Sequence, residues 1–165
     1  MSLSDLCQRC GLCCDGTLFS HVPLQAGEVE PARRNGLDVG VIADGTPVLR
    51  QGCTALCERR CTVYTERPEA CRRYSCRLFT QVAAGTVSPE DALTVVAEAH
   101  ALLSQLERGL PPDTEARPSP ILERARFAGL SELGAPAPET QALRERLEAH
   151  LDAHFHGGPR RFGGT

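Results

Sequence analysis

Hydrophobic residues in the second half of the chain recur at helical spacing. Between Pro89 and Arg108 they include Leu93, Val96, Leu103 and Leu106. The run Ser88-Pro89-Glu90-Asp91 has the pattern of a capping box, and Gly109 and Pro111 follow the last apolar position. This segment therefore predicts one long amphipathic helix.

Two further helices are expected after it. Ser119-Pro120 opens a shorter helix that reaches about Phe127. From Pro138 onward, apolar residues stand at every fourth position, at Leu143, Leu147, Leu151 and Phe155. We expect this last helix to pack on the helix that begins at Pro89. Residues 157–165 show no periodicity, which predicts a mobile tail.

The first half predicts shorter elements. Asp44-Gly45 lies between two short apolar runs, so a β-hairpin is expected over 39–49. Helix-forming residues over 25–34 end at Asn35-Gly36, which is a stop pattern. Pro68 lies at the start of a short helix expected over 67–74.

A short helical turn is also expected at the start of the chain, capped by Ser4 or Asp5, with Gly11 breaking it soon after. The fold class predicted from these elements is α+β. We expect a small, irregular module with a β-hairpin over 1–84, and then a helical C-terminal extension over 85–156.

Composition narrows the function classes. The chain has 165 residues, a net charge of −3, only 4% aromatic residues and no Trp, so its apolar core should be thin. All 18 basic residues are Arg, and 21 acids outnumber them, which argues against nucleic acid as a partner. The first residues lack a basic and apolar leader, so we expect a cytoplasmic protein with no membrane partner.

Cysteine is the most informative residue type. All 9 cysteines lie between Cys7 and Cys76. In a reducing compartment, clustered thiols are more often metal ligands than disulfides. Four of them stand within eight residues, as Cys7-x-x-Cys10-x-x-Cys13-Cys14. Projected on an ideal helix, Cys7, Cys10 and Cys14 share one side and Cys13 points elsewhere, so the adjacent Cys13 and Cys14 are expected to have different roles.

The remaining cysteines complete a recognisable pattern. Cys53 is followed by Leu56, then come Cys61-x-x-Tyr64, Arg67-Pro68-x-x-Cys71-Arg72 and Cys76. Together with the first four cysteines, this pattern resembles the YkgJ-type cysteine cluster (CxxCxxCC) family, described as a zinc- or iron-chelating domain. The resemblance covers about residues 5–80. It implies eight metal ligands, namely Cys7, Cys10, Cys13, Cys14, Cys53, Cys61, Cys71 and Cys76.

Cys57 is the ninth thiol, and it stands where the family commonly has a polar loop residue, so it is the weakest ligand candidate. Eight thiolates would fill one or two metal centres, most simply two zinc sites of four cysteines each. The Cys-rich module over 1–84 is therefore expected to be metal-organised. Each such site would carry a net charge of about −2. Six arginines beside the cysteines are expected to offset this charge: Arg9, Arg59, Arg60, Arg72, Arg73 and Arg77.

The resemblance leaves the cofactor open between Zn²⁺ and Fe, including an iron-sulfur cluster. The rival to a metal-binding module is an iron or iron-sulfur redox protein, or an accessory factor, because flagellin lysine N-methylases contain a similar cysteine cluster. No Gly-rich nucleotide loop or carboxylate pair is evident, so the sequence favours a binding protein over an enzyme, and we predict no catalytic residues. The C-terminal helices could instead dock a protein partner. His150, His154 and His156 form a weaker candidate metal site, as does His21.

Overall fold

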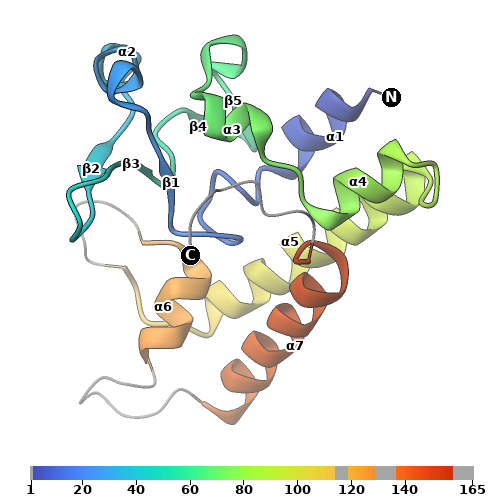
Figure 1. Cartoon of the computed structure of the whole chain (residues 1–165). Helices are drawn as coiled ribbons and strands as arrows, with labels where there is room; N and C mark the ends of the chain where they lie inside the picture. The colour runs from blue at the N-terminus through green and yellow to red at the C-terminus, as the bar shows by residue number, and fades with distance from the viewer. Residues whose placement is uncertain (1, 114–118, 129–136, 158–165) are drawn as a thin grey trace.

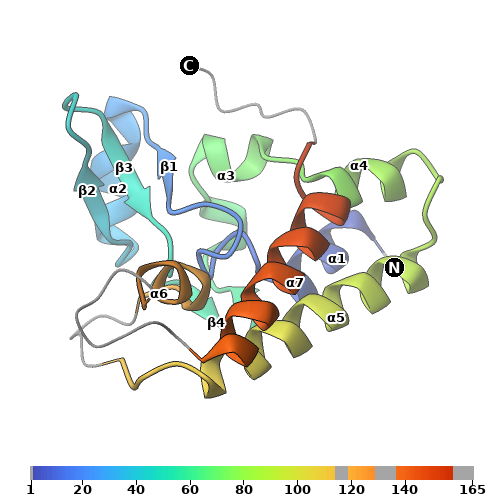
Figure 2. The same ribbon diagram turned by 90° about the horizontal axis from the view of Figure 1, so that it is seen from below.

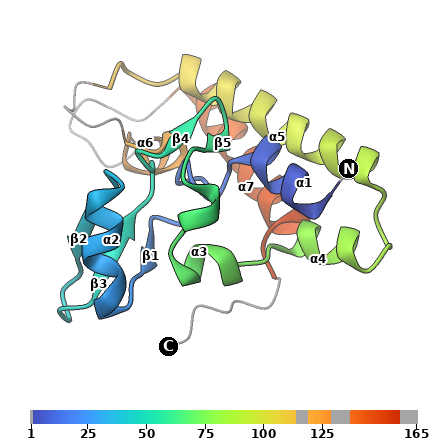
Figure 3. The same cartoon turned by 90° about the horizontal axis from the view of Figure 1, so that it is seen from above.

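The computed structural model describes residues 2–113, 119–128 and 137–157. It has a mixed α+β architecture, as predicted. A small sheet with one short helix lies on one side, and two long helices lie side by side on the other (Figure 1). Short segments that carry most of the cysteines lie between these two parts (Figure 3).

Long helices dominate the C-terminal part. Helix α5 (Pro89–Arg108) is the longest, and the Ser88 hydroxyl caps it by accepting a hydrogen bond from the Asp91 amide at 3.0 Å. Helix α7 (Pro138–His154) packs along α5, and α6 (Ile121–Ala128) contacts both of them (Figure 2). The three helices that the apolar spacing predicts are confirmed, within about two residues at each end.

These helices share one apolar cluster with residues from the first half of the chain. We call it the helical core, and its buried members are Leu6, Leu12, Leu78, Ala92, Val96, Ala99, Leu102, Leu103, Leu106, Leu122, Ala125, Leu147, Leu151 and Phe155. The predicted packing of α7 on α5 is therefore confirmed. Because Leu6, Leu12 and Leu78 belong to it, the helical core reaches into the cysteine-rich part.

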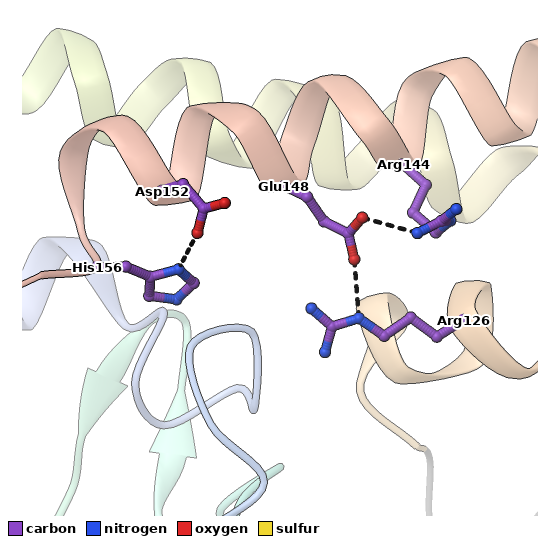
Figure 4. A network of polar contacts seen from close by, with 5 residues as sticks. All are labelled: Arg126, Arg144, Glu148, Asp152 and His156. Carbon is purple, nitrogen blue, oxygen red and sulfur yellow. Dashed lines mark hydrogen bonds and ion pairs between the residues drawn. The ribbon is translucent and has the colours of Figure 1, made fainter.

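A polar network ties α6 to α7 at the surface (Figure 4). The Arg126 Nε donates to Glu148 Oε1 at 2.8 Å, and Arg144 Nη1 donates to Glu148 Oε2 at 2.7 Å. One turn beyond, the His156 ring meets the Asp152 carboxylate at 2.6 Å. Such half-exposed ion pairs fix the orientation of α6 more than they add stability.

The sheet has three antiparallel strands in the order β1-β3-β2. Strands β2 (Val39–Val41) and β3 (Pro47–Arg50) form the hairpin expected around Asp44-Gly45. Strand β1 (His21–Pro23) pairs with the other edge of β3, with Val22 opposite Leu49. The 3-10 turn η1 (Ala26–Glu28) and helix α2 (Val29–Arg34) follow β1 and end at Asn35, as predicted.

A second and smaller apolar cluster lies under this sheet. We call it the sheet core, and its buried members are Val22, Leu24, Ala32, Leu37, Leu49 and Ala55. It has no aromatic residue among these members, which agrees with the thin core expected from composition.

The first helix, α1 (Leu3–Cys10), begins earlier than predicted. The Ser2 hydroxyl accepts from the Asp5 amide at 3.2 Å, and the Asp5 carboxylate accepts from the Ser2 amide at 2.8 Å. This reciprocal pair is a capping box, so the expectation that Ser4 or Asp5 caps the helix was wrong. Gly11 ends the helix with φ +68°, as its position suggested.

Four short elements link the two cores. They are strands β4 (Leu56–Cys57) and β5 (Arg60–Cys61), the 3-10 turn η2 (Tyr64–Glu66) and helix α3 (Glu69–Arg73). Helix α4 (Arg77–Ala83) is the next element along the chain, and it was not predicted. Among the described residues, no helix combines the length and apolar character that a membrane crossing requires. The expected tail lies outside the described residues, apart from Gly157.

Candidate metal centre

Eight of the nine cysteines line one cavity of about 260 Å³ between the two cores. They are Cys7, Cys10, Cys13, Cys14, Cys53, Cys61, Cys71 and Cys76. The ninth, Cys57, is exposed on β4 and does not line the cavity. All nine cysteines are thiols rather than disulfides. The structure thus brings together the eight positions that the sequence pattern selected.

Four of these thiols meet beside the helical core. Cys7 and Cys10 come from α1, Cys13 follows the end of α1, and Cys76 is the N-cap of α4. Cys10 and Cys76 pack directly against the helical core. We call these four residues the first thiol group.

Their electrostatics show that they share one environment. The pKa of Cys7 is raised to about 11, mainly by burial and then by the neighbouring Cys76. Burial also raises the pKa of Cys13 well above its ordinary value, with Cys10 and Cys76 as the next causes. Since one thiolate disfavours ionisation of the next, the group holds its negative charges poorly without a cation.

The other four thiols meet beside the sheet core. Cys53, Cys61 and Cys71 pack against it, and the Cys53 amide donates to the Cys14 carbonyl oxygen at 2.7 Å. The pKa of Cys14 is raised to about 12, mainly by burial and then by Cys53, Cys61 and Cys71. We call Cys14, Cys53, Cys61 and Cys71 the second thiol group.

The split between Cys13 and Cys14 begins at Gly11. A residue with φ +68° ends α1 before either cysteine, so the two lie in a turn and not on the helix. The helical projection, which placed Cys14 with Cys7 and Cys10, does not apply past this point. Instead Cys13 joins Cys7 and Cys10, while Cys14 faces the second thiol group.

Backbone amides point at two sulfur atoms of the first thiol group. The Phe79 amide donates to Cys76 Sγ at 3.3 Å. A hydrogen bond from the Leu12 backbone favours the Cys10 thiolate, although burial has the larger effect and raises the Cys10 pKa. Amide donors around sulfur are the outer contacts that stabilise metal-bound thiolates.

The six arginines expected around the thiols differ in whether they line the cavity. Arg59 and Arg72 line the cavity, and Arg73 forms an ion pair with Glu69 at 3.2 Å instead. Arg67 was not among the six arginines expected there, yet it lines the cavity, and its charge opposes the rise that burial causes in the pKa of Cys7 and Cys71. Its position in the Arg67-Pro68-x-x-Cys71 run was the only available indication.

The histidines have other contacts. His150 Nε2 lies 3.0 Å from the Val95 carbonyl oxygen, and its ring centre lies 4.7 Å from that of the tilted His154 ring. His21 Nδ1 contacts the Ser20 hydroxyl at 3.0 Å, and His100 Nε2 lies 2.7 Å from the Cys10 carbonyl oxygen. Within the described part of the chain, no three His, Cys, Asp or Glu side chains already stand in a metal-binding arrangement.

Comparison with protein families gives a match over the cysteine-rich part. The family model CxxCxxCC, described as "Putative zinc- or iron-chelating domain", matches residues 6–92, more than half of the 165 residues. The chain belongs to the CxxCxxCC family. The CxxCxxCC match includes all nine cysteines and ends within α5. No curated protein and no solved structure matches the chain.

Proposed function

We propose that the protein chelates two metal ions, Zn²⁺ or Fe²⁺, one in each thiol group. One observation carries this proposal. The eight cavity cysteines divide into two sets of four, each against its own core, and Cys57 belongs to neither. Four thiolates are a complete tetrahedral shell for a structural metal ion.

The donor set fits such ions in number and in chemistry. In the metal-free chain, burial keeps these thiols protonated, so an ion must displace their protons as it binds. Because the described side chains are not yet in a metal-binding arrangement, binding would also draw the sulfur atoms inward. A bound ion would supply a neutralising charge and a crosslink between segments far apart in sequence.

A closed shell of four thiolates leaves no open position for a substrate. We therefore infer a role in holding metal, whether for structure, storage or delivery, rather than in catalysis. The first thiol group would connect α1 to α4. The second would connect the loop after α1 to β5 and α3.

An iron-sulfur cluster is the second candidate, and it applies to the first thiol group alone. Three cysteines spaced by two residues plus one remote cysteine match a ferredoxin ligand set. The packing of Cys76 beside Cys7 and Cys10 supplies that remote residue. A redox-active centre would then lie next to the helical core.

Elemental analysis tests both candidates. On protein purified without oxygen, we expect about two zinc or iron ions per chain without labile sulfide. Iron with an equal amount of sulfide would select the cluster instead. Absence of tightly held metal would overturn the proposal.

Three serine variants test the division of the thiols. Cys13→Ser and Cys14→Ser should each remove about one ion, and they should remove it from different groups. Cys57→Ser is the matched control, since it also removes one thiol but should retain both ions. Loss of metal in Cys57→Ser equal to that in Cys14→Ser would contradict the assignment of eight ligands.

A further inference from the structure

Arg67 lines the cavity that the two thiol groups share. It follows η2 and directly precedes Pro68 and α3, and it lines the same cavity as the eight cysteines. Its side chain is partly buried, unlike the neighbouring Arg72, which is exposed. Its place at the junction of the two cores therefore differs from that of the surface arginines.

Two contacts with one residue hold this side chain. The guanidinium carbon lies 3.5 Å from the centre of the Tyr64 ring, and Nε donates to the Tyr64 carbonyl oxygen at 2.8 Å. Stacking on a ring suits the planar guanidinium, and the Nε bond uses one of its five N–H donors. The four N–H donors on the terminal nitrogens take no part in the contact with Tyr64, so they are available to donate to cysteine sulfur atoms.

Arg67 shares one cavity with both thiol groups. Cys7 of the first group on α1 and Cys71 of the second group on α3 line this cavity together with Arg67, and its volume is about 260 Å³. The two contacts with Tyr64 fix the guanidinium within this shared lining. Arg67 is thus placed to act on both sets of thiols at once.

When metal is bound, the thiol groups near Arg67 carry a net negative charge. A divalent ion with four thiolates leaves a net charge of about −2, so two loaded groups hold about −4 in one partly buried region. Burying like charges together is unfavourable unless a cation offsets them. Arg73, by comparison, forms its ion pair with Glu69 at the surface.

We propose that Arg67 is the shared counter-ion of the two thiol groups and sets the metal affinity of both centres together. This inference rests on the proposed function. Arg67 would be a positioning residue that acts on the sulfur atoms and never binds the ion itself. Its stacking on Tyr64 would hold the guanidinium in place whether or not metal is bound.

Zinc affinity measured against a chromophoric chelator tests this proposal. Reduced, metal-free protein would be titrated under anaerobic conditions, for the wild type, Arg67→Gln, Arg67→Lys and Arg73→Gln. In Arg67→Gln both binding steps should weaken about 10- to 100-fold, which is the usual loss for an outer contact of a metal ligand. Arg67→Lys should recover part of the loss because it keeps the charge, and Arg73→Gln should equal the wild type.

A second measurement separates this role from damage to the fold. Rates of thiol alkylation in the metal-free protein, resolved by mass spectrometry, would be compared at one pH. Loss of a nearby positive charge should slow the reaction of Cys7 and Cys71, whereas unfolding would expose the thiols and speed it. Faster alkylation in Arg67→Gln would overturn the proposal.

The outcomes also distinguish this inference from the proposed function. If the wild type binds fewer than two ions, the proposed function fails first. If the wild type binds two ions and Arg67→Gln binds them equally well, only the role of Arg67 is wrong. Weakening confined to one binding step would likewise show that the counter-ion is not shared.

Discussion

Among the residues that the structure describes, the helical core contains fourteen buried side chains and the sheet core contains six. The helical core joins the long helices α5 and α7, of which α5 has a side-chain N-cap, and it includes a fully buried Phe155. The sheet core covers strands of three or four residues. Since buried apolar area is the main stabilising contribution, the helical core can hold its helices together with little help, whereas the sheet core cannot.

The cysteines are distributed in keeping with this difference. The first thiol group lies on a core that is already large, and only two of its members pack directly against it. Three of the four members of the second group pack against the small sheet core. A metal ion in the second group would therefore supply stability that the small apolar core of this region does not provide.

Metal removal should have the largest effect and should separate the two regions. A chelator added to reduced, loaded protein should abolish amide protection in β1–β3 and over 53–71, while α5 and α7 stay protected. The reason is that a structural zinc site contributes on the order of 10 kcal/mol, comparable to the stability of a whole domain. Hydrogen exchange resolved by mass spectrometry measures this directly.

Equal loss of protection in α5 and in β3 would break the comparison, because the two cores would then unfold as one unit. Unchanged exchange everywhere would show that the sheet core is stable without metal. For helix α1 we expect a partial loss of amide protection on metal removal. It carries Cys7 and Cys10, but Leu6 anchors it in the helical core.

Truncation of Phe155 should have the next largest effect on stability, and this effect should fall on the helical core. The side chain is 1% exposed, and its backbone oxygen accepts from the Arg77 amide at 3.0 Å. Phe155→Ala should lower the free energy of unfolding of the helical core by about 3–5 kcal/mol, the usual cost of removing a buried ring. Chemical denaturation followed by circular dichroism measures it.

The metal content of Phe155→Ala sharpens the test. Because the second thiol group packs on the sheet core, its ion should be retained when the helical core is weakened. Phe127→Ala is the matched control, since that ring is 59% exposed and should change stability little. Loss of both ions in Phe155→Ala would show that the second group depends on the helical core.

Local patterns predicted the helical part well and the sheet part less well. Ser88 and Pro89 specify the start of α5 within a few residues, and Asp44-Gly45 specifies the β2–β3 hairpin, because these elements are decided by near neighbours. Strand β1 has three residues and no periodicity, and it exists because Val22 pairs with Leu49. Such a pairing has no local pattern from which it could be predicted.

The same limit applies to the candidate site. Spacing and family resemblance identified the eight cavity cysteines and set Cys57 apart. The grouping of Cys13 with Cys76 could not be derived, because it depends on the turn at Gly11 and on the packing of α4 against α1. Helix α4 was not predicted; only residues 74–76 separate it from α3, and its N-cap is Cys76 itself.

The smallest predicted effect concerns Gly11, at the point where the two thiol groups diverge. Gly11 has φ +68°, and a Cβ there would lie 3.0 Å from the Arg59 carbonyl oxygen. Gly11→Ala should therefore cost about 2–3 kcal/mol, from left-handed strain plus a contact with backbone that cannot easily move. Thermal unfolding of the loaded protein measures this cost.

Gly36→Ala provides the matched control for crowding. Gly36 has φ +71° and nothing within 4 Å of an added Cβ, so it should show the strain alone, about 1 kcal/mol. The excess cost at Gly11 then reports how tightly the β4–β5 turn packs on the end of α1. If the two variants lose equal stability, the turn yields to the added methyl group, and the separation of Cys13 from Cys14 does not depend on close packing there.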